Sequence, residues 1–416
     1  MPHHKFYLGD VMNCLKQIPD NTVQCVVTSP PYWSLRDYGV DGQIGLEKSP
    51  EEFILKMVEV FREVKRVLRP AGTCWVNLGD SYIANKTGSN IQRNSKLEGG
   101  KDTQIEACKR PDKKSEYLKP KDLCGIPWRV ALALQADGWF LRSDIIWSKP
   151  NAMPSSVTDR PGLAHEYLFL LTKKPRYYYD GEGIKEDVVN GDPNPPRGSA
   201  GVFGEVNAGR RKPDLRNGRI GAYQNRAICG EGDGTTPTSE ASRDISKRNK
   251  RTVWEISTEG CPEAHFATFP RKLVEPCILA GTSPKACQIC GAPWGRVNEP
   301  SEEYAKMLGK GYHDHSGDLT AGMSQPKKMP RTFADYITVD WVPTCKCVGN
   351  DGSGRCIVLD PFGGSGTVTL VASGLGRDSI YIDLNQDYLD IALQRNGFNG
   401  LCHADTYEII RNHIDF

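Results

Sequence analysis

Short apolar segments alternate with segments of helical periodicity in the first part of the chain. The pattern predicts a strand and turn at residues 4–10, an amphipathic helix at 11–20, a buried strand with its loop at 23–32, a long helix at 49–72 and a strand at 73–79. Ser49 can cap the long helix, and Pro70 can end it. The order strand, helix, strand favours a parallel sheet covered by helices.

Two polar and basic segments interrupt this pattern. Residues 81–121 are aperiodic, and residues 191–251 are rich in Gly, Asn, Arg and Ser. Such composition is consistent with a solvated loop and also with a loop that contacts an anionic partner. Periodicity returns between them, where residues 127–150 predict a helix and a strand and residues 164–180 predict another strand.

The clearest pattern lies near the C-terminus, in the sequence CIVLDPFGGSGTVTLVASGLGRDSIYID. It predicts a buried strand at 357–359, a tight loop at 360–366, a helix from Thr367 and a second strand that ends at Asp383. Glycines let a backbone approach a ligand at a helix N-terminus, and an acidic residue ending the next strand can accept hydrogen bonds from ribose hydroxyls. The loop has no P-loop lysine and lacks the dinucleotide glycine spacing. We therefore predict a nucleotide-like cofactor, with a structural turn as the alternative.

Composition and charge exclude several classes of protein. The chain has 416 residues, a net charge of +2 and a mean hydropathy of −0.50. No apolar run approaches the length of a membrane span, and the first residues lack the apolar region of a signal peptide. The 14 cysteines have no regular spacing, which argues against a secreted disulfide scaffold. These observations predict a cytoplasmic protein in a reducing compartment, without a membrane partner.

Two motifs together resemble the amino-methyltransferases of DNA, which transfer a methyl group from S-adenosylmethionine to an exocyclic amine of cytosine or adenine. They are TSPPYW at residues 28–33 and DPFGGSGT at residues 360–367. Residues 8–32, 145–180 and 265–284 also resemble core segments of that family. The catalytic loop precedes the cofactor loop, as in the permuted group called beta. The resemblance implies a Rossmann-like α/β fold with a mostly parallel twisted sheet, circularly permuted motif order, loop insertions and a small zinc-ribbon-like insertion.

The resemblance also implies roles for individual residues. Catalysis would rest on Ser29, Pro30, Pro31 and Tyr32, and the cofactor would contact Asp10, His265, Phe269, Asp360, Phe362, Gly363, Gly364, Ser365, Thr367 and Asp383. A base amine is a poor nucleophile, so acceptors such as the Ser29 hydroxyl and the Pro30 carbonyl would localise its lone pair as the methyl group approaches. Tyr32 offers a face on which a flipped base can stack. Taken alone, the same residues could form a buried Pro-Pro turn.

The choice of base depends on Ser29. Family members with Ser at this position are mostly N4-cytosine enzymes, and those with Asp or Asn mostly act on adenine N6. The resemblance therefore favours N4-cytosine, with N6-adenine as the first alternative. An RNA or protein amine as substrate, and a non-catalytic zinc-containing DNA-binding protein, are further alternatives. Methylation of cytosine C5 would need a nucleophilic Cys after Pro, but Cys277 lies in an apolar helical stretch where Cys is usually a core residue.

Two cysteine pairs form a candidate metal site. Cys287 and Cys290 are separated by two residues, and Cys345 and Cys347 by one. Two such pairs can hold a tetrahedral structural zinc ion, and reduced, unliganded thiols are the alternative. His313 and His315 are spare candidate ligands. Methyl transfer to an amine needs no Lewis acid, so the zinc would be structural or part of a DNA contact.

These predictions divide the chain into seven segments. They are a catalytic half of the core (1–84), a basic insertion (85–121), the continued core (122–185), a basic loop for target recognition (186–252), a cofactor-pocket helix (253–284), the cysteine-containing zinc insertion (285–350) and the S-adenosylmethionine-binding half (351–416). Residues 86–121 and 197–251 are the candidates for phosphate contact and target reading. The resemblance implies double-stranded DNA as partner and leaves open a homodimer and a restriction endonuclease partner.

Overall fold

The computed structural model describes residues 2–34, 39–40, 42–83, 117–187, 247–260, 270–302, 304–305, 336–398 and 407–412. The chain divides into two compact units. Met1–Ile184, Lys250–Val297 and Val339–Phe416 form the first, and Lys185–Asn249 with Asn298–Thr338 form the second. Most of both predicted basic insertions lies outside the described residues, as do His265, Phe269, His313 and His315. The predicted division into seven segments stays a prediction.

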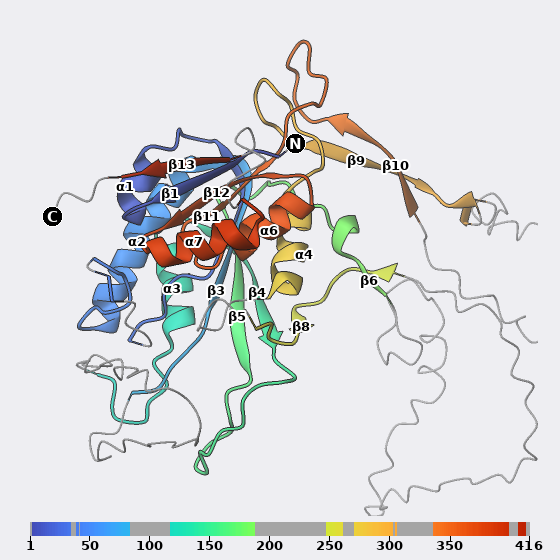
Figure 1. The fold of residues 1–416 in the computed structure, drawn as a ribbon. Helices are drawn as coiled ribbons and strands as arrows, with labels where there is room; N and C mark the ends of the chain where they lie inside the picture. The colour runs from blue at the N-terminus through green and yellow to red at the C-terminus, as the bar shows by residue number, and fades with distance from the viewer. Residues whose placement is uncertain are drawn as a thin grey trace, which may run out of the picture. The chain divides into compact units, whose positions relative to one another are not determined.

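A nine-stranded sheet, counted over the described residues, forms the centre of the first unit, in the order β13-β1-β12-β11-β2-β3-β5-β4-β8 (Figure 1). Its strands are β1 (His4–Leu8), β2 (Val23–Thr28), β3 (Leu68–Leu78), β4 (Phe140–Ser148), β5 (His165–Thr172), β8 (Val253–Glu255), β11 (Ile357–Asp360), β12 (Asp378–Asp383) and β13 (Tyr407–Arg411). Neighbouring strands are parallel except where β5 pairs with β3 and β4. The predicted mostly parallel α/β fold is confirmed.

The strand order shows the permutation directly. The C-terminal strands β11 and β12 lie between β1 and β2, although the N-terminal strands precede them by more than 300 residues. The two halves of the chain therefore form one continuous sheet. The carboxyl ends of the catalytic-loop strand β2 and the cofactor-loop strand β11 lie side by side, which is where α/β sheets bind ligands.

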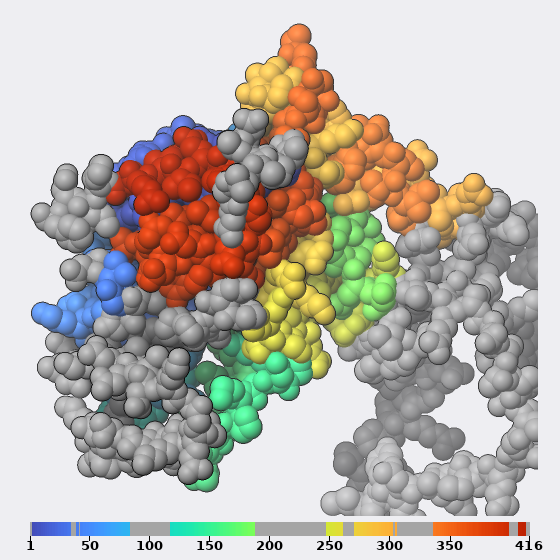
Figure 2. Space-filling view, in the orientation of Figure 1, coloured from blue at the N-terminus to red at the C-terminus, as the bar shows by residue number. Residues whose placement is uncertain are grey.

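Helices cover both faces of this sheet. The helices α1 (Val11–Lys16), α2 (Pro50–Val67) and α3 (Ile126–Ala136) pack on one face, and α4 (Arg271–Gly281), α6 (Thr367–Gly374) and α7 (Gln386–Arg395) on the other. Strand residues alternate accordingly: Val26 packs with the first group, and Cys25 and Val27 with the second. Figure 1 shows α6 and α7 in front of the strands, and in Figure 2 the red C-terminal residues form much of that surface.

The long helix ends earlier than its periodicity predicts. Ser49 caps α2 as expected, because its side chain accepts a hydrogen bond from the Glu52 amide over 3.2 Å. The helix stops at Val67, and Leu68 is already extended, with φ −70° and ψ 135°. Proline disfavours helical backbone before it and cannot donate a hydrogen bond, so the residues up to Pro70 begin β3 instead.

Smaller elements complete the described structure. Two short strands of the second unit, β6 (Glu186–Asp187) and β7 (Lys247–Arg248), pair antiparallel. A 3₁₀ turn, η1 (Glu182–Ile184), follows the core, and β9 (Trp294–Pro300) pairs with β10 (Tyr336–Pro343) in a two-stranded sheet. In the part of the chain that is described, no helix is both long and apolar enough to cross a membrane.

Candidate active site

A pocket of about 300 Å³ opens at the carboxyl edge of the sheet. Most of the predicted site residues line it: Asp10, Ser29, Pro30, Pro31, Tyr32, Phe362, Gly363, Gly364, Ser365, Thr367 and Asp383. Asp360 lies beneath the wall of the pocket with 1% of its surface exposed. His265 and Phe269 lie outside the described residues, so their predicted contacts stay predictions.

The glycine loop between β11 and α6 packs tightly against β12. The Gly363 amide donates to the Ile382 carbonyl over 2.8 Å, and a Cβ atom at position 363 would lie 2.2 Å from the Tyr381 ring. A larger residue is therefore excluded at this position. The Tyr381 hydroxyl in turn donates to the Gly364 carbonyl over 2.7 Å. The loop backbone is held next to the strand end, which leaves its outer side facing the pocket.

Asp383 ends β12 and orients the same loop. Its carboxylate accepts hydrogen bonds from the amides of Gly364 and Asn385, each over 2.8 Å. Burial raises the pKa of Asp383 to about 6, although these backbone amides oppose the shift. A carboxylate at this position can still accept hydrogen bonds from ligand hydroxyl groups, because each oxygen has two lone pairs.

Asp360 joins the two loops from below. One of its oxygens, Oδ1, accepts from the Thr28 hydroxyl over 2.7 Å and from the Phe362 amide over 3.1 Å. Its second oxygen, Oδ2, is buried without a hydrogen-bond partner. Burial raises the pKa of Asp360 to about 7, because the hydrogen bonds from Thr28 and Phe362 only partly offset the cost of burying the charge.

Asp10 and the TSPPYW loop form other parts of the wall. The Asp10 side chain caps α1 by accepting from the Asn13 amide over 3.0 Å. Ser29 is partly exposed to the pocket. Trp33 is a core residue with 1% of its surface exposed, and its indole donates to the Glu47 carbonyl over 2.9 Å. Trp33 therefore anchors the loop, while the residues before it face the cavity.

Comparison with known proteins identifies the family. The family model N6_N4_Mtase, described as DNA methylase, matches residues 23–287 and 323–394. The chain is 36% identical over 387 residues to the Type II methyltransferase M.Cfr9I of Citrobacter freundii, a match that covers 93% of this chain and 85% of that protein. It is 34% identical over 391 residues to M.SmaI of Serratia marcescens, covering 94% and 90% of the two chains.

The chain belongs to the DNA methylase family. It is an S-adenosylmethionine-dependent DNA methyltransferase of the N4/N6 type. Among solved structures, it is similar to the PvuII DNA methyltransferase (cytosine-N4-specific), with 16% identity, a TM-score of 0.48, and coverage of 94% of this chain and 86% of that chain.

Three polar residues of the methylase pocket were not predicted from the sequence. Asn77, Lys149 and Glu166 line the same cavity as Ser29. Asn77 and Lys149 lie where β3 and β4 end. A polar residue at the carboxyl end of an apolar strand is typical of a ligand site in an α/β sheet, so the sequence pattern could have indicated these two residues. Glu166 lies near the start of β5, and only the antiparallel direction of that strand brings it to the same edge.

Cys277 of the methylase is a core residue, as the sequence analysis predicted. It is fully buried in α4, and its thiol donates to the Leu273 carbonyl over 3.2 Å. Burial raises the pKa of this thiol well above its usual range, which keeps it in the unreactive neutral form.

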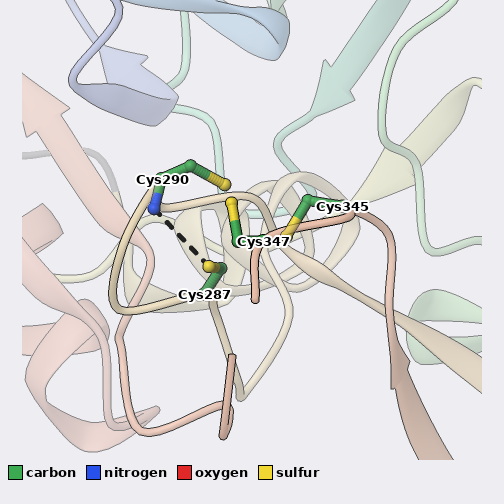
Figure 3. A group of neighbouring side chains, drawn as sticks. All are labelled: Cys287, Cys290, Cys345 and Cys347. Carbon is green, nitrogen blue, oxygen red and sulfur yellow. Dashed lines mark hydrogen bonds between the residues drawn. The ribbon is translucent and has the colours of Figure 1, made fainter. Parts of the chain in front are cut away.

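The two cysteine pairs of the methylase meet outside this pocket. The Sγ atoms of Cys287, Cys290, Cys345 and Cys347 all lie within 4.8 Å of one another. Figure 3 shows the two pairs on separate loops, with the Cys290 amide 3.5 Å from the Cys287 sulfur. The first pair precedes β9 and the second follows β10.

A buried glutamine connects this cysteine cluster to the sheet. Gln24 donates from its side chain to the Gly291 carbonyl over 2.6 Å and accepts from the Ile357 amide over 2.6 Å. It therefore links the turn of the first cysteine pair to the starts of β2 and β11. The catalytic and cofactor loops lie at the opposite ends of these two strands, so the cluster is remote from the pocket.

Proposed function

We propose that the protein methylates the exocyclic N4 amine of cytosine in double-stranded DNA. The observation that carries the proposal is one pocket lined by both Ser29 of the SPPY loop and the glycine loop before α6. Ser at the first position of the SPPY loop favours cytosine over adenine within this family. A target base must leave the duplex to enter such a pocket.

The residues around the glycine loop fit S-adenosylmethionine. The loop backbone at Gly363 and Gly364 would follow the cofactor, the Asp383 carboxylate would accept from its ribose hydroxyls, and Asp10 would hold its amino-acid end. Bound there, the cofactor supplies an electrophilic methyl group on a positively charged sulfur.

The SPPY loop would activate the amine. The Ser29 hydroxyl and the Pro30 carbonyl accept the two amine hydrogens, which draws them out of the ring plane and localises the lone pair on nitrogen. The prolines fix the loop backbone, so the acceptors are in place before the base arrives. Tyr32 would stack on the flipped base. The amine nitrogen would bond to the methyl carbon as the sulfur–methyl bond of the cofactor breaks, which leaves S-adenosylhomocysteine. The methylated amine would then lose one proton to solvent, because a serine hydroxyl is too weak a base to take it during transfer.

We also propose that the four-cysteine cluster binds one structural zinc ion. A tetrahedral zinc ion with bonds of about 2.3 Å to sulfur requires sulfurs roughly 3.8 Å apart, which the close approach of the four Sγ atoms permits. Its link through Gln24 to the starts of β2 and β11 supports a structural role and not a catalytic one. The homodimer and the restriction endonuclease partner stay predictions of the family resemblance.

Elemental analysis tests the zinc proposal. Purified protein is expected to contain one zinc per chain, and Cys345→Ser with Cys347→Ser should remove it and lower Tm. Cys124→Ser is the control for the zinc content, because this cysteine lies outside the cluster and its replacement should leave the zinc in place. Purified wild-type protein that contains no zinc, together with a Tm that the Cys345→Ser and Cys347→Ser substitutions leave unchanged, would show that the thiols are simply reduced.

Mass spectrometry of nucleosides tests the function. Several DNAs are incubated with the protein and S-adenosylmethionine, digested and compared with DNA treated without cofactor. N4-methylcytosine is the expected product. N6-methyladenine would preserve the family chemistry and overturn the choice of base. Methylation of RNA alone, or cofactor binding without any modified nucleoside, would overturn the proposal.

A further inference from the structure

A connected group of polar side chains lies in the pocket beside the SPPY loop. The Tyr32 hydroxyl donates to Glu166 Oε2 over 2.6 Å, and the Asn77 amide donates to the same oxygen over 3.1 Å. The other oxygen, Oε1, pairs with the Lys149 ammonium. The Lys149 Nζ atom also lies 4.3 Å from the centre of the Trp147 ring. Tyr32 of the SPPY loop is thus joined to a lysine on β4 through one carboxylate.

The position of this group in the sheet separates it from the cofactor loops. Along the carboxyl edge the strands run β12, β11, β2, β3, β5 and β4, so the glycine loop and Asp383 lie at one end of the pocket. Ser29 follows β2 in the middle, and Lys149 follows β4 at the other end. Three strand spacings, roughly 14 Å, separate β2 from β4. The Lys149 side chain spans part of this distance, because its ammonium group reaches Glu166 on β5, whose other oxygen accepts from Tyr32 in the same loop as Ser29. A flipped base that presents its amine to Ser29 would therefore extend toward the Lys149 ammonium group.

The ion pair between Lys149 and Glu166 adds little to the stability of the fold. The side chains of Lys149 and Glu166 are only 18% and 15% exposed. A pair buried to this extent loses much of its hydration, and apolar residues of similar size are often as stable. Among the described residues Glu166 is the hydrogen-bond acceptor of Lys149, while an ammonium group carries three donors. Lys149 therefore has donors to offer a ligand in the pocket.

We propose that Lys149 donates a hydrogen bond to the ring nitrogen next to the target amine, and that Glu166 is the positioning residue that holds both Lys149 and Tyr32. This inference rests on the proposed function. The acceptor is N3 in cytosine and N1 in adenine, so the inference applies to either base. Glu166 neutralises the ammonium, which keeps a free cation away from the positive charge that develops on the methylated amine.

A substrate analogue tests the contact directly. Once the methylated sequence is mapped, kcat/KM is measured on a duplex with cytosine and on one with 3-deazacytosine at the target, for wild type and Lys149→Met. (If the product is N6-methyladenine, adenine and 1-deazaadenine take their place.) We expect the preference for the natural base to shrink about tenfold or more in Lys149→Met, the scale of a hydrogen bond to a charged group. Because the preference is a ratio, it does not depend on how much of the variant is folded.

Control variants separate the proposed hydrogen bond to the base from other roles of Lys149. Lys121→Met removes a lysine that pairs with Asp159 over 2.7 Å and is 64% exposed, and it should keep the wild-type preference. Glu166→Gln should also shrink the preference, with unchanged affinity for S-adenosylmethionine. A lower rate with an unchanged preference in Lys149→Met would overturn the inference, because a phosphate contact or a structural role acts equally on both duplexes. Wild-type protein that methylates no DNA would overturn the proposed function, and this inference with it.

Discussion

Thr28 donates its hydroxyl to the Asp360 carboxylate over 2.7 Å, although 332 residues separate them in the chain. Thr28 is the last residue of β2 and Asp360 is the last residue of β11. The residues that follow them form the SPPY loop and the glycine loop. One buried hydrogen bond therefore fixes the two loops relative to each other at the edge of the sheet where the pocket opens.

Replacing Thr28 by Val keeps the shape of the side chain and removes this donor. We expect the free energy of unfolding to fall by about 1–3 kcal/mol at pH 8, because the Asp360 carboxylate then loses a charge-assisted hydrogen bond in the interior. Chemical denaturation measures the change. Thr22→Val is the control, since its hydroxyl bonds an exposed carbonyl of Pro19, and it should change stability little. Equal effects of the two substitutions would contradict the importance of the Thr28 contact.

The buried carboxyls predict a pH dependence of stability. The pKa values of Asp360 and Asp383 rise from 3.8 to about 7 and about 6 on folding. A raised pKa means that the folded state binds the proton more tightly than the unfolded state. The contribution of each group is therefore fully present below pH 3.8 and is lost as pH rises through its folded-state pKa.

Asp360→Asn isolates this effect from the other carboxyl groups. The amide is nearly isosteric with the carboxyl group and does not titrate. The free energy of unfolding of the variant, relative to that of wild type, should therefore increase between pH 4 and pH 7, by up to about 4 kcal/mol. The measurement is chemical denaturation of ligand-free protein at several pH values. A difference between variant and wild type that stays constant over this range would contradict the raised pKa.

Ser29→Ala should separate catalysis from cofactor binding. The Ser29 hydroxyl is proposed to accept a hydrogen from the amine as the methyl group approaches, and removing one such group costs roughly a hundredfold in turnover. The affinity for S-adenosylmethionine should be nearly unchanged, because the glycine loop and Asp383 are intact. Single-turnover kinetics and calorimetry measure the two quantities. Equal losses in both would refute the role given to Ser29.

Asp383→Ala, unlike Ser29→Ala, should weaken the binding of the cofactor. Its carboxylate accepts from Gly364 and Asn385 and would accept from the ribose hydroxyls. We expect weaker binding of S-adenosylmethionine by at least tenfold, the scale of lost hydrogen bonds to a charged group. Asp390→Ala is the control, because Asp390 lies on α7 and pairs with Gln386 outside the set of pocket-lining residues. Unchanged affinity in Asp383→Ala would remove this residue from the cofactor site.

The sequence predicted the fold because its strongest patterns lie at the centre of the sheet. The apolar runs of β2 and β11 are buried on both faces, and the glycine loop that follows β11 has a distinctive composition. The position of Glu166 could not be predicted in the same way. It depends on β5 running antiparallel to β3 and β4, and pairing direction is not encoded in a local apolar run.

The cysteine cluster shows the same difference between local and long-range information. The spacing of Cys287 and Cys290, and of Cys345 and Cys347, predicted two pairs that could share one ion, and the structure brings all four sulfurs together. The connection of that cluster to the sheet depends on Gln24, a polar residue inside an apolar strand. Its partners are more than 260 residues away in the chain, so no local pattern indicates them.

Gly79 controls the orientation of Tyr32 and gives a final test of the pocket. A Cβ atom at position 79 would lie 2.6 Å from the Tyr32 ring, which is closer than real contacts allow. Gly79→Ala should therefore push the ring away and weaken the 2.6 Å hydrogen bond from Tyr32 to Glu166. Because base stacking contributes about 1–3 kcal/mol, we expect kcat/KM for DNA to fall roughly tenfold or more, with unchanged affinity for S-adenosylmethionine.

Gly374→Ala provides the matched control for this substitution. Gly374 ends α6, and a Cβ atom there would meet nothing within 4 Å, so activity should stay at the wild-type level while the helix gains slightly in stability. A Gly79→Ala protein with wild-type kcat/KM would show that the Tyr32 ring position is unimportant for the reaction. A loss of cofactor affinity would show instead that the substitution deforms the whole pocket, because Tyr32 lies on the base side of Ser29 and the cofactor loops lie on the other.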